Sequence, residues 1–199
     1  MSEIIIDTAQ SNDYPEAARV TTCAMITNPL AVAVFNGARE IFEIINRVSF
    51  ESGSGRIYLA KEKEQILGVM RITEWPDCHA KFRGGYKLPP PAVALLKDSA
   101  PRMEQWLQTW GERDPEKHHW HLTLLAVLPE RQGQGIGKKL VNLYCDFLDS
   151  TGSAGYIETD RDVNVPFYES FGFNVIDKEP ILNVPNWYLW REKNSKAAE

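Results

Sequence analysis

The feature that most constrains this chain is an apolar stretch that ends in a glycine-rich turn and continues as an amphipathic helix. Residues 120–127 predict a strand, Pro129 opens a turn, and glycines occupy alternate positions over residues 133–137. From Gln134 to Ser150 the apolar residues recur at helical spacing. Glycines let a backbone approach a ligand closely, and free N–H groups at a helix start attract anions. The segment therefore predicts a loop that can hold a diphosphate, with Lys138 adding positive charge.

Spacing separates this loop from two common phosphate-binding patterns. A P-loop needs glycine where Gln132 stands and Ser or Thr where Lys139 stands. The dinucleotide fingerprint needs a third glycine at position 138. The pattern that remains is Gln/Arg-x-x-Gly-x-Gly/Ala, which Gln132, Gly135 and Gly137 satisfy. A glycine-rich turn without a ligand is the alternative interpretation of the same residues.

This loop, placed after a strand that ends in Val-x-Pro, resembles the acetyl-CoA loop of the GNAT superfamily of N-acetyltransferases. Residues 164–173, with the sequence NVPFYESFGF, resemble the superfamily's Asn…Phe-Tyr-x-x-x-Gly-Phe signature. The short Asn-x-Pro-Phe-Tyr form, with His119-Trp120 before the central strand, is most similar to the puromycin N-acetyltransferase-like branch. The resemblance in motifs covers about residues 118–191.

The resemblance implies an α/β fold with one mixed, splayed central β-sheet and helices on both faces. A single acetyltransferase domain is expected over residues 1–192, with an acceptor-side insertion at 75–117 and a frayed tail at 193–199. The sequence itself predicts strands and helices in the following places. The strands are expected at 3–8, 56–60, 66–74, 120–127, 156–159 and 187–191, and the helices at 14–27, 37–50, 101–110, 134–150 and 163–170.

Acetyl-CoA is the cofactor that the resemblance implies. Backbone groups of Leu125, Ala126 and Val127 would pair with the pantetheine amides, and Asn164 would contact the cofactor near its arm. Backbone N–H groups of the loop would hold the pyrophosphate. The loop residues are Gln132, Gly133, Gln134, Gly135, Ile136, Gly137 and Lys138.

Acetyl transfer to an amine needs one group that takes a proton and one that gives a proton to the departing sulfur. Tyr168 matches the family tyrosine that donates to the sulfur, and the alternative is a tyrosine that only packs in the core. His121 and Glu158 are the two candidate bases. For His121 the alternative is a half-exposed polar residue on the strand, and for Glu158 it is a carboxylate paired with a basic or backbone group.

A metal site is not expected from the sequence. His119-x-His121 has a spacing that metal ligands use, but no third His or Cys lies in a matching local motif. The sequence therefore predicts no metal.

Composition and charge exclude several other classes of protein. The 199 residues carry 22 basic and 27 acidic side chains, and this net charge of -5 argues against a nucleic-acid partner. Three cysteines are too few for a disulfide scaffold. The N-terminus does not resemble a signal peptide, and the longest apolar run, Leu30–Phe35, is too short to span a bilayer. We expect a cytoplasmic protein without membrane contact, and a homodimer is compatible with the sequence.

The expected function is transfer of an acetyl group from acetyl-CoA directly to an amine of a small molecule. Two alternatives stay open, namely a protein or peptide N-acetyltransferase and a non-catalytic CoA-binding module. The acceptor depends on residues 10–50, 75–117 and 180–191, where the sequence shows no motif that identifies it.

Overall fold

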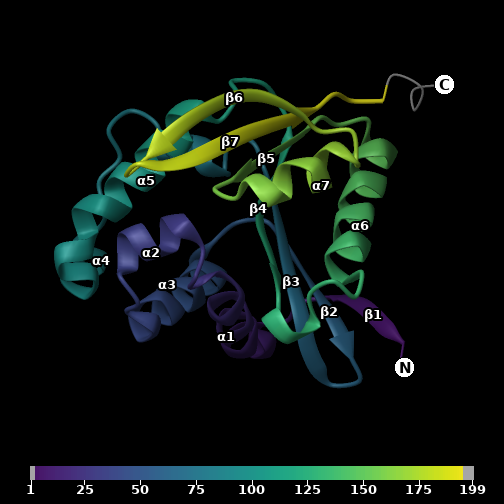
Figure 1. The fold of residues 1–199 in the computed structure, drawn as a ribbon, viewed down its shortest axis with the longest axis horizontal. Helices are drawn as coiled ribbons and strands as arrows, with labels where there is room; N and C mark the ends of the chain where they lie inside the picture. Colours follow the sequence, from purple (N-terminus) through teal and green to yellow (C-terminus); the bar gives the residue numbers. More distant parts are fainter. Residues whose placement is uncertain (1–2, 195–199) are drawn as a thin grey trace.

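A computed structural model describes residues 3–194. Its centre is one seven-stranded sheet in the order β1-β2-β3-β4-β5-β7-β6 (Figure 1). Neighbouring strands are antiparallel except β4 and β5, which are parallel, so the sheet is mixed as predicted. The strands are β1 Ile4–Thr8, β2 Arg56–Glu62, β3 Gln65–Glu74, β4 Trp120–Val127, β5 Gly155–Thr159, β6 Asn174–Ile181 and β7 Val184–Arg191.

Seven α-helices and five short 3-10 helices connect the strands within the described residues. The α-helices are α1 Tyr14–Met25, α2 Pro29–Phe35, α3 Arg39–Ser52, α4 Pro90–Leu96, α5 Ala100–Arg113, α6 Ile136–Thr151 and α7 Val165–Glu169. The 3-10 helices are η1 Ser11–Asp13, η2 His79–Phe82, η3 Lys97–Ser99, η4 Pro129–Arg131 and η5 Asp162–Asn164.

The centre of the sheet is covered on both faces. Strand β3 carries five consecutive buried residues, Ile66–Met70, a run that a strand shows only where helices or other layers pack on each side. In Figure 1, α1, α2 and α3 lie on one side of β2 and β3, and α6 lies on the other. Gly68 of β3 allows the close approach of α6, because a Cβ at this position would stand 3.1 Å from Ile136 and 3.3 Å from Leu140.

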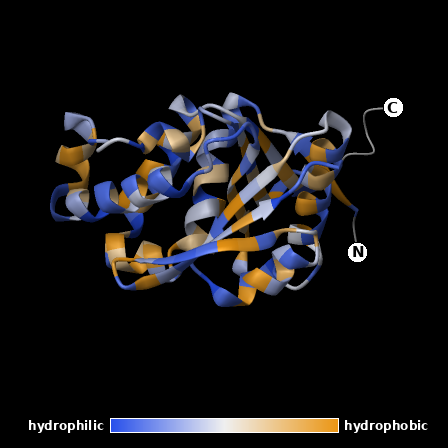
Figure 2. Cartoon of the chain, turned by 90° about the horizontal axis from the view of Figure 1, so that it is seen from above, coloured by the Kyte–Doolittle hydropathy of each residue, from blue (hydrophilic) through white to orange (hydrophobic). Residues whose placement is uncertain are grey.

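The buried stripe of α6 explains why the segment after the glycine turn folds as a helix. Ile136, Leu140, Tyr144 and Leu148 recur at helical spacing and are all at most 1% exposed. Gly152 ends the helix in the left-handed conformation with φ of 60°. Apolar residues gather along the strands and on the inner faces of the helices in the same way elsewhere in the chain (Figure 2).

Three longer elements, α2, α4 and β6, lie outside the predicted ranges. The sequence predicted a helix that ends at 27, before Asn28-Pro29, but Pro29 is also the first residue of α2, a position where its missing N–H costs nothing. Strand β6 was not predicted because it lies at the sheet edge and only Ile181 of its eight residues is buried. An edge strand with little burial does not show the alternation that marks a strand in the sequence.

The segment 75–117 forms one wall of a second apolar cluster. Helices α2 and α3 pack there with α4 and α5, through residues that include Phe35, Phe42, Leu96 and Trp106. Part of the predicted tail, residues 195–199, lies outside the described residues. No single described helix is long and apolar enough to cross a membrane, and one bent pair, Ser11–Met25 with Pro29–Phe35, passes the length and composition test when taken together.

Candidate active site

Strands β4 and β5 are neighbours for only two residue pairs. Trp120 pairs with Gly155 and His121 pairs with Tyr156. Beyond His121, β4 continues beside β3, whereas Ile157–Thr159 of β5 pair with β7. One edge of β4 from Leu122 onward therefore has no strand beside it in the described part of the chain. This is the splayed sheet that the sequence predicted, and the gap offers unpaired backbone groups to a ligand.

The glycine turn lies at the open end of this gap. Gly133 and Gly135 have φ of 73° and 83°, and Gly135 caps α6. A Cβ at either glycine would meet nothing within 4 Å, so these two glycines serve the backbone conformation and not the packing. Gln132 fixes the start of the turn, because its side-chain amide donates to the Val127 carbonyl at 3.0 Å. The first N–H groups of α6 have no acceptor within the helix, so they are available to hydrogen-bond an anion.

The basic side chains around the turn are only partly available to a ligand. Arg131 is held by Glu62 at 3.0 Å and by Gln134 at 3.0 Å, and Lys139 reaches the Ile4 carbonyl at 3.4 Å. Arg161, which follows β5, lines the gap from the opposite side. The sequence analysis did not single out Arg161, because its charge is far from the loop along the chain.

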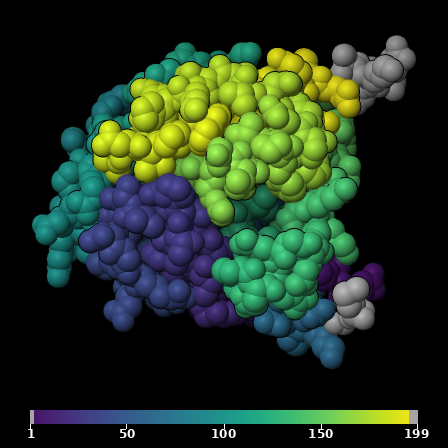
Figure 3. All heavy atoms as spheres, viewed as in Figure 1, coloured from purple at the N-terminus to yellow at the C-terminus, as the bar shows by residue number. Residues whose placement is uncertain are grey.

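A hollow of about 150 Å³ lies between β4 and α7. Figure 3 shows it as a recess between the segment around α7 and the glycine turn. Among the residues predicted to bind the cofactor, the structure brings the following to this hollow: Leu125, Ala126, Val127, Gln132, Asn164 and, from the catalytic set, Tyr168. Gly133, Gln134, Gly135 and Lys138 are exposed in the turn, and the side chain of Ile136 is buried in the core, so it can offer only its backbone.

The hollow continues inward to two further cavities. The next one has about 80 Å³, shares Leu125, Asn164 and Tyr168 with the first, and adds Glu158. The third has about 390 Å³, is itself partly open to solvent, and shares Trp110 and other residues with the second. Because neighbouring cavities share lining residues, the three adjoin one another and mark a path that begins at the glycine turn.

The segment 75–117 lines much of the largest cavity. Its lining is mainly apolar and aromatic, and includes Phe42, Phe82, Tyr86, Trp106 and Trp110. Four of these five aromatic residues belong to the segment for which the sequence had no motif. The cavity is within the size range of small-molecule sites.

Tyr168 lies where the first two cavities meet. Its side chain is 6% exposed, and its hydroxyl makes no hydrogen bond to any residue within 3–194. Burial raises the pKa of Tyr168 well above its ordinary value, so the hydroxyl keeps its proton at neutral pH. The arrangement leaves a protonated donor facing the cavity.

Glu158 lines the middle cavity, its side chain is only 2% exposed, and its carboxylate is held by two histidines. Its Oε2 lies 2.7 Å from His121 Nε2, and both of its oxygens lie within 3.2 Å of His79 Nδ1. Burial by itself raises the pKa of Glu158, but the electrostatic interaction and the hydrogen bonds with His121 and His79 outweigh it, so the pKa is lowered. The carboxylate therefore stays ionised.

The structure places His121, the other predicted base, behind Glu158. His121 is fully buried and lines none of the three cavities. Its Nδ1 is 3.1 Å from Asp114 Oδ2 and its Nε2 faces Glu158. Both ring nitrogens are thus engaged, and a proton from the cavity would have to pass through Glu158 to reach this ring.

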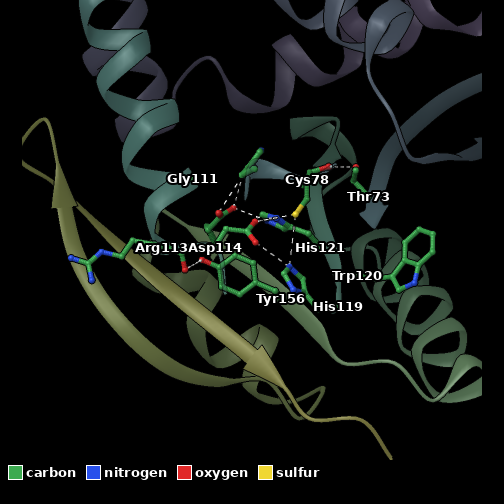
Figure 4. Close-up of polar contacts among 12 residues, drawn as sticks. Thr73, Cys78, Gly111, Arg113, Asp114, His119, Trp120, His121 and Tyr156 are labelled. Carbon is green, nitrogen blue, oxygen red and sulfur yellow. Dashed lines mark hydrogen bonds and ion pairs between the residues drawn. The ribbon is translucent and has the colours of Figure 1, made fainter. Parts of the chain in front are cut away.

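Three more polar residues complete the group around His121, and of these the sequence connected only His119 with it, through the spacing His119-x-His121. Cys78 Sγ lies 3.2 Å from Asp114 Oδ2 and 3.9 Å from His119 Nε2, and His119 Nε2 lies 3.3 Å from Asp114 Oδ1 (Figure 4). Cys78 follows β3, and Asp114 follows α5. No local spacing signals this group, because the fold brings Cys78 and Asp114 together from 36 positions apart.

Comparison with known proteins identifies the family. The model of the acetyltransferase (GNAT) family matches residues 33–173, which is well over half of the chain. The chain therefore belongs to the acetyltransferase (GNAT) family, a family of acyltransferases that use acetyl-CoA.

Individual relatives agree with this assignment. An uncharacterized N-acetyltransferase from Schizosaccharomyces pombe is 33% identical over 61 residues, which are 31% of this chain and only a quarter (25%) of that relative. A crystal structure from Corynebacterium glutamicum, described as histone acetyltransferase HPA2 and related acetyltransferase, matches with a TM-score of 0.75 and 19% identity over the full length of both chains. A GNAT family acetyltransferase from Brucella melitensis in complex with acetyl-CoA matches with a TM-score of 0.52 and 18% identity, again over both full chains. These structural matches establish the fold.

Proposed function

We propose that this protein transfers the acetyl group of acetyl-CoA directly to an amine of a small molecule. The observation that carries the proposal is the set of adjoining cavities that begins at the glycine turn, includes Tyr168 and Glu158 in its lining, and ends in an aromatic cavity of about 390 Å³. These cavities bring together a place for the donor, two groups that can move protons, and an aromatic space for the acceptor.

The residues at the open end fit acetyl-CoA. The unpaired edge of β4 at Leu125–Val127 can hydrogen-bond an amide-containing arm, as an added strand would. The turn at Gly133–Gly137 and the start of α6 can hold its pyrophosphate, and Asn164 stands beside the arm with its amide donating to Thr159 Oγ1 at 3.0 Å. Bound there, acetyl-CoA supplies the acetyl group and a thiol leaving group.

Tyr168 and Glu158 take the two proton-transfer roles. As the amine nitrogen bonds to the acetyl carbon and the carbon–sulfur bond breaks, the amine loses a proton and the sulfur needs one. The ionised Glu158 carboxylate on the cavity wall accepts the first proton. The unpaired Tyr168 hydroxyl donates the second to the sulfur.

The aromatic lining of the largest of the three cavities favours a small acceptor with an apolar body. Phe82, Trp106 and Trp110 are among its lining residues, and its volume is within the range of small-molecule sites. The resemblance of the Asn164–Tyr168 motif to the puromycin N-acetyltransferase-like branch points in the same direction. We therefore expect an amine with an apolar or aromatic body.

The test is release of free thiol from acetyl-CoA in the presence of a panel of amines. The panel should contain aliphatic and aromatic primary amines, polyamines, amino acids, and peptides with a free N-terminus or an internal lysine. We expect the highest kcat/KM for a small amine with an apolar or aromatic body. Turnover of the peptides alone would replace this proposal with a peptide acetyltransferase. Tight acetyl-CoA binding without thiol release for any amine would replace it with a CoA-binding module.

A further inference from the structure

We propose that Cys78, Asp114, His119 and His121 form a structural zinc site that fastens the segment 75–117 to the central sheet. All four side chains are buried, and one ligand atom from each lies within 4.8 Å of the others. The proposal is independent of acetyl transfer, because none of the four residues lines the path except Cys78, which touches the largest cavity.

The spacing of the ligand atoms suits a tetrahedral ion. With metal–nitrogen and metal–oxygen bonds near 2.0–2.1 Å and a metal–sulfur bond near 2.3 Å, neighbouring ligand atoms should stand about 3.3–3.6 Å apart. The distances are 3.1 Å from His121 Nδ1 to Asp114 Oδ2, 3.2 Å from Cys78 Sγ to Asp114 Oδ2, and 3.3 Å from His119 Nε2 to Asp114 Oδ1. Cys78 Sγ and His119 Nε2 are 3.9 Å apart. The four side chains point toward one another in Figure 4.

Each histidine has an outer partner that fixes its ring for metal binding. His119 Nδ1 lies 2.7 Å from the Lys117 carbonyl, to which it must donate. His121 Nε2 lies 2.7 Å from Glu158 Oε2 and donates to that carboxylate. In neutral imidazoles the inward nitrogens, His119 Nε2 and His121 Nδ1, then carry lone pairs. A carbonyl or carboxylate behind a ligating histidine is the usual support of such sites.

Without a cation, some of the buried polar atoms of these four side chains lack suitable hydrogen-bond partners. Two inward lone pairs would face the Asp114 carboxylate, unless both buried histidines were charged. The buried Asp114 Oδ1 accepts no hydrogen bond of good geometry from the described residues, although His119 Nε2 lies 3.3 Å from it. A divalent ion accepts all four groups at once, and its two positive charges balance the Asp114 carboxylate and the Cys78 thiolate. The site as a whole is then neutral, which its burial requires.

The donor set selects the metal and its role. One thiolate, two imidazoles and one carboxylate in a tetrahedral arrangement suit Zn²⁺ rather than Mg²⁺ or Ca²⁺, which prefer oxygen ligands. Four protein ligands leave no open position for water or substrate, so the ion is structural. It joins the chain after β3 and the end of α5 to β4. Through His121 it also steadies Glu158, and through Cys78 it steadies His79.

The first test measures metal in the purified full-length protein. Elemental analysis after expression in zinc-supplemented medium should give about one zinc per chain. Replacement by Co²⁺ should produce the visible absorption of a tetrahedral site and a thiolate-to-cobalt charge-transfer band. Removal of the ion with a strong chelator should lower Tm by roughly 10 °C, and added Zn²⁺ should restore it.

Two matched pairs of variants assign the ligands. His119→Ala should lose the zinc, whereas His118→Ala should keep it, since the neighbouring His118 is exposed and pairs with Glu74. Cys78→Ser should lose the cobalt charge-transfer band, whereas Cys145→Ala should keep it, because Cys145 is a buried cysteine of α6 outside the group. The wild-type measurements stand even if a ligand variant fails to fold.

A wild-type protein without stoichiometric zinc, and with a Tm that neither chelator nor added Zn²⁺ changes, would overturn the proposal. Zinc that persists in both His119→Ala and Cys78→Ser would also overturn it, since the ion would then lie elsewhere. All of these measurements are made without substrate, so failure of the proposed acetyl transfer would not affect them.

Discussion

The two ends of the β4–β5 pair differ in whether the backbone groups of the two strands are hydrogen-bonded to each other. At one end His121 pairs with Tyr156, and a dry group of polar side chains fills the space beside the strands. At the other end the strands separate, and the edge of β4 at Leu125–Val127 faces an open hollow. Glu158 lies between them, since it lines the middle cavity and its carboxylate contacts His121 of the buried group.

The difference shows that this fold holds side chains in a fixed orientation at one end and admits a ligand at the other. Backbone groups that are paired in the sheet cannot bind a ligand, so the donor must enter where the strands separate. Side chains that must keep a fixed orientation need exclusion of water and partners on every side, and these conditions exist only where the strands are paired. The following predictions test whether the closed end serves orientation and the open end serves binding.

The largest fall in kcat is expected for a change of Glu158, which lies between the two ends. Glu158→Gln keeps the size of the side chain but removes its ability to accept a proton, so kcat should fall by about 10²–10⁴-fold. The KM for acetyl-CoA should change little, since Glu158 does not line the outer hollow. Steady-state kinetics with the best amine measures both values.

Glu74→Gln is the matched control, because Glu74 also pairs with a histidine, His118, at 2.8 Å but is exposed at the end of β3. It should leave kcat unchanged. If Glu158→Gln retained activity within a few-fold of the control, the proton-accepting role of Glu158 would be wrong.

The second effect concerns the proton donor at the open end. Tyr168→Phe removes only the hydroxyl, so kcat should fall by roughly 10–100-fold while acetyl-CoA affinity and Tm stay near the wild-type values. Tyr188→Phe is the control, because Tyr188 is a buried tyrosine of β7 that lines none of the three cavities. Its hydroxyl also lacks a hydrogen-bond partner within the described residues.

The ratio of kcat between the two tyrosine variants shows whether Tyr168 donates a proton or only packs. Equal rates for Tyr168→Phe and Tyr188→Phe would show that Tyr168 only packs in the core. A fall in acetyl-CoA affinity without a fall in kcat would make it a binding residue instead.

The same comparison explains which parts of the site could be predicted from the sequence. The open end depends on short-range patterns, namely the glycine spacing after Gln132 and the motif from Asn164 to Tyr168, and the structure brings Gln132, Asn164 and Tyr168 to one hollow. The closed end depends on contacts between distant residues. His79 meets Glu158 across 79 positions and Cys78 meets Asp114 across 36, so no local spacing could have predicted either contact.

The helices and strands also separate into those that the sequence predicts and those that it does not. The strands and helices with a buried stripe or run, such as β3, β4 and α6, were predicted within a few residues. The short α2 and the exposed edge strand β6 were missed because neither shows a regular apolar period. The absence of a metal at His119-x-His121 stays a prediction, which the zinc measurements test; Cys78 and Asp114, the neighbours that suggest a site there, come from other elements.

The smallest change in stability and binding is expected in the glycine turn, where two variants test whether a glycine is needed for its backbone conformation or for the room it leaves. Gly135 has φ of 83° and open space around it, whereas Gly137 lies in the first turn of α6, where a Cβ would stand 3.9 Å from Phe167 and from Val127. Gly135→Ala should therefore strain the backbone by about 1–2 kcal/mol, lower Tm by roughly 2–8 °C and weaken acetyl-CoA binding several-fold. Gly137→Ala should keep both values or raise Tm slightly, because alanine favours a helix. Calorimetric titration and thermal unfolding of the two variants decide the matter: equal losses in both would mean that the turn needs room for the ligand at each glycine, and not a particular backbone conformation at Gly135.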